Sequence, residues 1–584
     1  MFIALLALIG LVGCVPFAAA QPSPAAPQAT GLALQVDLAA ARFPIDPLIY
    51  GVNSYGLSES EAAALAAAIN LPIRRWGGNT TSRYNWQTDF YNTGSDYFFE
   101  NIPAEGRVAS ELPNNSATNR FIAANRAAGI ESLITVPLIG WVAKNSPDQH
   151  PFDCGFRVSR YQAQQATDPY DPDCGNGIAA AGNPNFAVGE RITGNDPTDT
   201  SITADPSFVQ AWVEHLVGRF GGATAGGVRF YALDNEPGLW NETHRDVFPG
   251  YLSFDELTNR GIAYAQAIKA ADPNALILGP VQDGWTRYFY ASYGSYTDAM
   301  AQADRDAKGV PFVVWYLQQF RQAEQTSGQR LLDYLDLHYY PQASGVTLQP
   351  AGDADRQALR LRSTRALWDP SYVDESWIVD TEGGNTSVQL LPRMRAWRDT
   401  FYPGTKLAIT EYNWGGLEHI NGALTQADVL GIFGRERLDM AMLWGPPTAD
   451  QPGAFALRMY RNYDGSGSSF GDQGLPASSA DQERVAIYAA ERSSDGALTI
   501  MLINKSSTAE AISLTFAHGA NGNSIGTIEQ YRYSSADLTQ ITRLSDQNLN
   551  GSLLNTTLPA SSITLLVVPA DAPRSFTYLP LVRS

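Results

Sequence analysis

The chain has 584 residues, more than one hydrophobic core usually organises, so we expect at least two domains. Hydrophobic residues make up 44% of it and charged residues 17%, as in soluble globular proteins. The formal net charge of -19 argues against nucleic acid and anionic membrane surfaces as partners, because both require a basic surface.

The N-terminal segment resembles an export signal followed by a linker. Residues 1–20 are apolar and end in Ala-Ala-Ala, as at a signal-peptide cleavage site. The Leu-Val-Gly-Cys sequence that ends at Cys14 also resembles a bacterial lipobox, so soluble secretion and a lipid anchor at Cys14 both stay open. Residues 21–30 are rich in Pro and Ala and predict a linker. No later stretch is long and apolar enough to predict a transmembrane segment.

A β/α rhythm fills residues 47–480. Its strand candidates lie at 48–53, 72–76, 132–139, 228–234, 275–281, 334–340, 406–410 and 439–444. Helical patterns separate most of them, at 60–68, 119–128, 207–220, 254–271, 313–324, 390–400 and 426–436. This alternation favours an α/β fold, a TIM-like (β/α)8 barrel, over an open doubly wound sheet. No Gly-x-Gly-x-x-Gly follows the first strand, which disfavours a dinucleotide-binding fold.

Three segments between the barrel strands are much longer than usual, and the largest comprises residues 140–206. Loops of this size on a barrel commonly form the walls of a cleft. The segment holds Cys154 and Cys174, which in an exported protein predict a disulfide that closes a surface loop. With only six His in the chain, a metal site at these cysteines is disfavoured.

A second domain is predicted from the C-terminal region. Alternating strands at 485–492, 498–504, 511–516, 527–533 and 562–569 indicate an antiparallel β-sandwich over residues 481–572. Residues 31–46 also alternate like a strand, and we expect this N-terminal strand to complete the β-sandwich. The tail at 573–584 carries no structural prediction.

Two glutamates dominate the functional analysis. Glu236, in Leu-Asp-Asn-Glu-Pro, and Glu411, in Ile-Thr-Glu-Tyr-Asn, each follow an apolar run at the end of the fourth and seventh predicted strands. All strands of a parallel barrel open onto one face, so the two carboxyl groups can meet there. Paired carboxyls of this kind cleave glycosidic bonds, one as acid/base and one as nucleophile. The residues therefore predict a secreted polysaccharide hydrolase.

Strand parity selects the residues that surround this pair. Asp234 and Glu236 share the inward parity of one strand, and His338 and Tyr340 that of another, while one of two adjacent arginines must also face inward. Candidates for positioning the substrate are Arg74, Asn79, Asn235, His338 and Tyr340. Candidate sugar platforms are Trp76, Trp86, Trp141, Trp414 and Trp444. Rivals for the second carboxylate are Glu375, Glu382 and Glu418.

Over nearly all of the mature length the chain resembles glycoside hydrolase family 44. The matching motifs lie at 74–80, 83–86, 153–155, 233–237, 279–285, 337–341, 367–370, 372–377, 410–413 and 459–464, in one order. The resemblance implies a TIM-like barrel with a β-sandwich, and retaining endo-hydrolysis of β-1,4-glucans such as carboxymethylcellulose and xyloglucan. It implies Glu236 as acid/base and Glu411 as nucleophile. Residues 382–386 look like an insertion relative to the family pattern.

The resemblance also bears on cofactors and partners. No cofactor is implied for the chemistry, but a structural calcium is, and no calcium ligands are apparent in the sequence. We expect a monomer whose partner is a polysaccharide. Two alternatives remain: a xylanase or arabinofuranosidase-type glycosidase, because Arg-Trp-Gly-Gly-Asn recurs in such enzymes, and a non-hydrolytic carbohydrate-binding surface protein.

Overall fold

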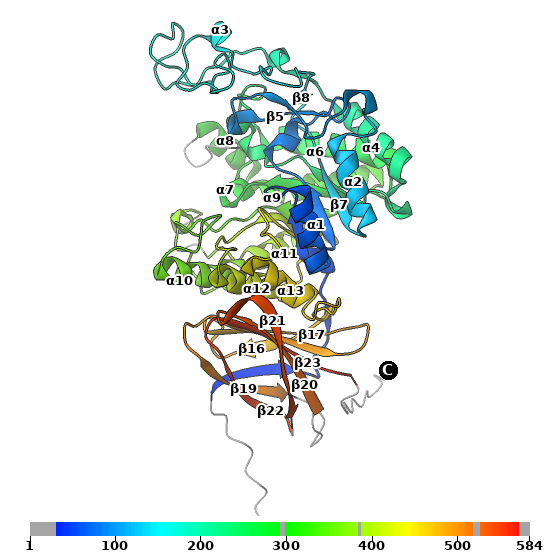
Figure 1. The fold of residues 1–584 in the computed structure, drawn as a ribbon. Coiled ribbons are helices and arrows are strands. Elements are labelled where there is room, and N and C mark those ends of the chain that lie inside the picture. Colours follow the sequence, from blue (N-terminus) through cyan, green and yellow to red (C-terminus); the bar gives the residue numbers. More distant parts are fainter. Residues whose placement is uncertain (1–30, 293–297, 383–386, 518–525, 550, 571–584) are drawn as a thin grey trace, which may run out of the picture.

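The computed structural model describes residues 31–292, 298–382, 387–517, 526–549 and 551–570. The predicted signal peptide, Cys14, the linker at 21–30 and the tail at 573–584 lie outside the described residues. The barrel occupies the middle of an elongated molecule, with the β-sandwich at one end and the long loop region around α3 (Val158–Tyr161) at the other (Figure 1).

The predicted barrel is confirmed. Eight parallel strands close in chain order, with the last pairing to the first: β3 Gly51–Asn53, β4 Ile73–Trp76, β7 Glu131–Val136, β10 Phe230–Leu233, β11 Leu276–Gln282, β12 Tyr334–Leu337, β13 Lys406–Tyr412 and β14 Met440–Leu443. Glu411 therefore lies on the seventh strand, and Glu236 follows the fourth.

Three strands have a boundary three residues from the predicted one, and one of these is the end of β7, at Val136 and not Ile139. Residues 47–50 form a 3-10 helix and not the start of β3, because Pro47 begins it and the Asp46 side chain caps the Leu48 amide. Strand β12 ends at Leu337, so that His338 and Tyr340 lie in the segment that leaves the barrel at its open face.

Each of the seven predicted helices is present. They are α1 Glu59–Ile69, α2 Ala117–Ala127, α4 Pro206–Phe220, α6 Phe254–Ala271, α9 Phe312–Ser327, α11 Leu390–Phe401 and α12 Ile420–Arg435. The ends follow local chemistry: in α4 the Asp205 carboxylate caps the first amides, Pro206 starts the helix, and Gly221 ends it at φ 90°.

Further helices carry weaker sequence signals. They are α5 Trp240–Thr243, α7 Trp285–Phe289, α8 Ala299–Lys308, α10 Ala354–Ser363 and α13 Pro452–Arg461. The sequence of α10 is mostly polar, yet the guanidinium of its Arg360 is buried and donates to the carbonyls of Trp414 and Ala351. A hydrophobic-periodicity search misses a helix that is anchored in this way.

The C-terminal region forms two sheets, in the orders β16-β1-β19-β22 and β2-β15-β17-β18-β23-β20-β21. Their strands are β1 Leu32–Asp37, β2 Phe43–Pro44, β15 Gln473–Leu475, β16 Ala477–Ser479, β17 Val485–Glu491, β18 Leu498–Asn504, β19 Glu510–Ala517, β20 Gly526–Ser534, β21 Asp537–Leu549, β22 Leu553–Leu558 and β23 Ser562–Val568. The N-terminal strand joins the β-sandwich as predicted, and its β1 pairs in parallel with β19. The sheets begin before residue 481, with β15 and β16. The sequence did not predict these two strands, because they are too short to show alternation.

The long loop region leaves the barrel through a short antiparallel pair, β8 Trp141–Ala143 with β9 Ser201–Thr203. It packs beside a second pair, β5 Phe90–Asn92 with β6 Asn101–Pro103. The predicted disulfide between Cys154 and Cys174 is present. In the described part of the chain, no helix combines the length and apolar character needed to cross a bilayer.

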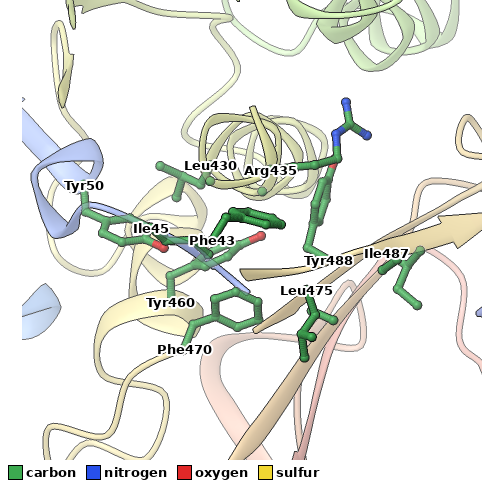
Figure 2. A pocket seen from close by; sticks show the side chains of 14 residues that line it. Phe43, Ile45, Tyr50, Leu430, Arg435, Tyr460, Phe470, Leu475, Ile487 and Tyr488 are labelled. Atoms are coloured by element: carbon green, nitrogen blue, oxygen red, sulfur yellow. The ribbon is translucent and has the colours of Figure 1, made fainter. Parts of the chain in front are cut away.

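Helix α12 joins the barrel to the β-sandwich. It is buried on nearly all sides, because α10, α13, β17 and β18 all pack against it. Figure 2 shows Phe43, Tyr460, Phe470 and Ile487 filling the junction beside this helix. A buried ion pair adds a polar anchor: Asp428 of α12 accepts 2.7 Å hydrogen bonds from Lys505 and from the Tyr488 hydroxyl.

We expect Asp428→Ala to destabilise the protein by about 3–5 kcal/mol, because it strands the buried Lys505 ammonium without its counter-ion. The Lys505 and Asp428 side chains are 5% and 2% exposed. Urea unfolding measures the loss. The control is Asp399→Ala, which removes a 59% exposed partner of Arg398 and should cost less than about 1 kcal/mol. Equal small losses in both variants would contradict the anchoring role.

Candidate active site

Glu411 is held at the barrel mouth by hydrogen-bond donors on both oxygens. It lies on β13, where the alternation of the strand points it inward. Arg75 Nη1 donates to Oε1 at 2.6 Å, and the Tyr340 hydroxyl donates to Oε2 at 2.8 Å. Donors on both oxygens, one of them a cation, suit an ionised carboxylate.

Glu236 reaches the same mouth by a turn and not by strand parity. The alternation stops at Leu233, because Asp234 and Glu236 both adopt left-handed backbone conformations, with φ of 70° and 47°. The Asp234 carboxylate turns away and accepts from the Ser82 hydroxyl and the Leu138 amide, so it anchors the turn. The Glu236 amide donates to the Val281 carbonyl at 2.9 Å, which holds the turn against β11.

His338 lies between the two carboxyl groups. Its Nδ1 is 2.8 Å from Glu236 Oε1 and 3.5 Å from Glu411 Oε2. One oxygen of each glutamate and one ring nitrogen of His338 all lie within 4.8 Å of one another. The structure thus brings together four of the predicted residues, Glu236, Glu411, His338 and Tyr340.

The two glutamates have different environments. Burial raises the pKa of Glu236 to about 8, with nearby Asp283 adding to the rise and Arg75 opposing it. Burial also lowers the pKa of His338 to about 4, so the imidazole is neutral at neutral pH. At that pH Glu236 holds a proton that it can donate, while Glu411 is surrounded by donors. This asymmetry is what an acid and a nucleophile require.

Arg74 is not in the site, and the arginine that matters is Arg75. On β4, Arg74 and Trp76 face outward, where Arg74 lies 3.6 Å from Glu59 and Trp76 packs against Phe121. Arg75 has the parity of Ile73, which belongs to the barrel interior. It is fully buried and donates to Asn53 as well as Glu411. Of the two adjacent arginines, only Arg75 therefore takes part in the site.

Three more tryptophans pack within the fold. The Trp86 ring stacks on His215 at 5.1 Å, and Trp414 donates its indole N–H to Ser363 within the core. They are 6% and 2% exposed, so neither presents a face to a sugar. Trp141 is half-buried at the start of β8 and packs against the core.

Trp444 remains a candidate platform. Its ring stacks on Tyr55 at 4.8 Å with an interplanar angle of 9°, and Tyr55 is 61% exposed. A Cβ on Gly78 would come within 2.7 Å of the Trp444 ring, so the indole covers the backbone there. The Gly78 amide donates to Asn235 Oδ1, which places this aromatic pair beside Asn235. Tyr55 has no sequence signal, because it lies in a loop.

Asn235 and Asn79 are neighbours at the mouth. Arg75 Nη2 donates to Asn235 Oδ1 at 2.7 Å, so the amide orientation is fixed with Nδ2 turned toward Asn79 Oδ1 at 3.4 Å. The rivals for the second carboxylate bond elsewhere: Glu375 pairs with Arg362, Glu382 pairs with Arg305, and Glu418 accepts from the Ala351 amide.

A second acidic cluster lies in the long loop region, near the disulfide. Ligand atoms of Glu100, His150 and Asp168 lie within 4.8 Å of one another. Both oxygens of Glu100 and Oδ2 of Asp168 are buried and meet no hydrogen-bond donor among the described residues. Burial and the Asp168 charge raise the pKa of Glu100 to about 8. Such a pair of facing carboxyls fits a divalent cation.

Known proteins resemble this chain over most of its length. The model of glycoside hydrolase family 44 matches residues 90–343. Endoglucanase A of Paenibacillus lautus is 30% identical over 558 residues, covering 93% of this chain and 73% of that protein. CelM2, a bifunctional glucanase-xylanase protein from a metagenome library, has a solved structure with a TM-score of 0.84 and 42% identity, covering 93% of this chain and 99% of that one. A Paenibacillus polymyxa xyloglucanase from family 44 gives a TM-score of 0.74 at 28% identity over 92% of this chain and 99% of its own, and it is also solved with xyloglucan.

We expect Glu236→Gln to gain stability over the unsubstituted protein as the pH rises from 4.5, the usual carboxyl pKa, to about 8. In that window the folded protein keeps a proton on Glu236 that the unfolded chain has released, so the native protein loses stability with rising pH. The Gln amide can still donate to His338 and has no proton to lose.

Thermal midpoints at about pH 4, 6 and 8 measure this gain. The control is Glu214→Gln, on the exposed face of α4, which should shift little. A gain of equal size at all three pH values would show that burial does not hold the proton on Glu236.

Proposed function

The chain belongs to glycoside hydrolase family 44, and from this premise we propose that it is an endo-acting hydrolase of β-1,4-glucans that retains anomeric configuration. One observation carries the proposal. A protonated carboxyl, Glu236, and a donor-bound carboxylate, Glu411, approach within 4.8 Å at the open face of the barrel. Retaining enzymes separate the two groups by about 5–5.5 Å and inverting enzymes by about 6.5–9.5 Å.

The proposed reaction has two steps. Glu411 attacks the anomeric carbon while Glu236 gives its proton to the departing glycosidic oxygen, so the C–O bond breaks as the bond to Glu411 forms. Glu236 then takes a proton from water, which displaces Glu411 and returns the enzyme to its starting state. The hydrogen bonds from Arg75 and Tyr340 orient Glu411 and stabilise it as the leaving carboxylate of the second step.

The mouth offers two contacts to a sugar. Asn235 presents Nδ2, which can donate to the 2-hydroxyl of the sugar that reacts. The stacked pair of Trp444 and Tyr55 provides a flat apolar face for a neighbouring ring. The substrate class rests on the relatives, described as an endoglucanase, a glucanase-xylanase and a xyloglucanase. Xylan is therefore the second candidate substrate.

We further propose that the protein acts outside the cell as a monomer. The Cys154–Cys174 disulfide suits an oxidising compartment. For the monomer, one chain supplies the two glutamates together with the Arg75, His338 and Tyr340 side chains that contact them.

Azide should distinguish the roles of the two glutamates. With an aryl β-cellobioside that carries an activated leaving group, we expect Glu411→Ala to be inactive until azide replaces the nucleophile and gives an α-glycosyl azide. In Glu236→Ala, azide should intercept the glycosyl-enzyme and give a β-glycosyl azide. Hydrolysis of unactivated glucan should fall about 10²–10⁴-fold in Glu236→Ala, the usual contribution of a general acid. Product anomers can be assigned by NMR.

The same proteins test the substrate. Reducing-sugar release should be highest on xyloglucan or carboxymethylcellulose. Release confined to xylan or arabinoside would support the glycosidase alternative, and glucan binding without release would indicate a binding protein. Full activity in both alanine variants would refute the assigned pair.

We also propose that Glu100 and Asp168 hold a structural calcium. Calcium prefers oxygen ligands, and it would replace the proton that the raised pKa otherwise keeps on Glu100 beside Asp168. The ion would tie β6, through Glu100 beside it, to the loop that carries the disulfide. His150 is 3.8 Å from Asp168 and would stay outside the coordination sphere.

In chelator-treated protein, we expect calcium to raise the thermal midpoint, because a ligand that binds only the folded state at about 100 times its Kd contributes about 2.7 kcal/mol. Glu100→Gln should abolish the rise, and His150→Gln should leave it intact. A rise with zinc alone, lost in His150→Gln, would contradict calcium and make the imidazole a ligand.

A further inference from the structure

The hydrogen bonds behind His338 determine where its proton lies. The Thr410 hydroxyl donates to Asp336 Oδ2 at 2.7 Å, and the Thr410 amide donates to Asp336 Oδ1 at 3.1 Å. A hydroxyl has one hydrogen, so the Thr410 oxygen can only accept from its other neighbour. That neighbour is His338 Nε2, at 3.1 Å. With Asp336 ionised and accepting on both oxygens, the imidazole carries its hydrogen on Nε2.

This tautomer has a consequence on the other side of the ring. In a neutral imidazole with hydrogen on Nε2, Nδ1 is a lone pair. Glu236 Oε1 lies 2.8 Å from Nδ1, a contact that two acceptors cannot make without a proton between them. The shared proton must belong to Glu236, because His338 has already used its own. The geometry thus places the proton on the carboxyl, given that burial keeps the His338 imidazole neutral.

We propose that Thr410 and Asp336 are positioning residues that fix the tautomer of His338 and thereby hold the catalytic proton on Glu236. The inference rests on the proposed role of Glu236 as acid/base. Neither residue touches a substrate. Both are fully buried, Thr410 on β13 directly before Glu411 and Asp336 on β12 two residues before His338. Strand register alone brings them together, since Asp336 pairs with Ala408 across the two strands.

The same arrangement serves both reaction steps. In the resting enzyme Nδ1 accepts the hydrogen bond that the protonated Glu236 donates, and an arriving glycosidic oxygen competes with Nδ1 for this proton. Once the proton has left, the Glu236 carboxylate faces the lone pair of Nδ1, and this repulsion favours recovery of a proton from water. With Nε2 bonded to Thr410, the ring keeps its tautomer through the cycle, so Glu236 alternates between acid and base beside an unchanged acceptor.

Other charged groups face these residues and must stay unchanged in a test. Around Glu236 they are Arg75, Asp96, Asp283, Arg287, Tyr288, Tyr340 and Glu411. Around Asp336 they are Arg75, Tyr288 and His338. Burial raises the pKa of Asp336, and His338, the Thr410 donors and Arg75 act against that rise. Substitutions at Thr410 change none of these charges.

The test compares Thr410→Val with Thr410→Ser. Valine keeps the shape but removes the hydroxyl, so Nε2 loses its acceptor, the imidazole moves its hydrogen to Nδ1, and that hydrogen bonds to an ionised Glu236. We expect the basic limb of the kcat/KM profile to move at least about one pH unit lower in Thr410→Val, because one unit corresponds to about 1.36 kcal/mol between the two protonation states. Thr410→Ser keeps the hydroxyl and should keep the limb.

Two substrates separate acid function from general damage. Thr410→Val should lose about tenfold or more on unactivated glucan at about pH 8, within the range that general acids contribute. It should lose less than about threefold on 2,4-dinitrophenyl β-cellobioside, whose leaving group departs without a proton. A structural defect would lower both rates alike and overturn the proposal.

Asp336→Asn is the second variant, should Thr410→Val fail to fold. The Thr410 amide still needs an acceptor at the position of Oδ1, so the new NH2 stands at Oδ2 and donates to the Thr410 oxygen. Thr410 must then donate to Nε2, and the same shift of the basic limb is expected. If the basic limb of the kcat/KM profile does not shift in folded variants, this inference is overturned while the acid/base assignment stands. Retained glucan hydrolysis in Glu236→Ala would instead overturn the acid/base assignment on which it rests.

Discussion

The active site is organised by the buried guanidinium of Arg75. Its donors reach Asn53 on the first barrel strand, Glu411 on the seventh and Asn235 after the fourth, at 2.6 to 3.0 Å. A fully buried cation is costly unless it is paired and hydrogen-bonded, so Arg75 constrains all three partners at once. That constraint orients the Glu411 carboxylate and leaves Asn235 with its NH2 toward the open face.

The second glutamate depends on the opposite condition. Glu236 is buried beside Asp283, while its neighbour His338 is neutral and cannot stabilise a carboxylate by charge. One carboxyl therefore keeps a proton and the other accepts from donors on both oxygens, although both lie within 4.8 Å of the same imidazole. Glycosidic cleavage with retention requires this difference, and it arises from packing and not from residue type.

Much of this protein could be predicted by reading patterns along the chain. Buried parallel strands are apolar over four or more residues, so β7, β10 and β13 stand out, and helices α4 and α6 show a clear apolar face. Short strands such as β15, and the mostly polar helix α10, could not be found, because their stability comes from partners distant in sequence. Among the site candidates, strand parity placed His338, Tyr340 and Glu411 well. Strand parity could not distinguish Arg74 from Arg75 without a reliable start for β4. The number of tryptophans in the sequence could not distinguish Trp444 from the buried Trp86 and Trp414.

By itself the sequence determined the barrel, the second domain built from the N-terminal and C-terminal regions, the disulfide pair and the two glutamates at strand ends. Each of these features produces a local periodicity or a motif in the sequence. Only the tertiary structure decided which arginine enters the site, how the turn after β10 delivers Glu236, and which carboxyl keeps its proton. Those outcomes depend on burial and on hydrogen bonds between residues up to 336 positions apart, such as Arg75 and Glu411. Local sequence patterns do not encode such contacts, because they form only when the barrel closes.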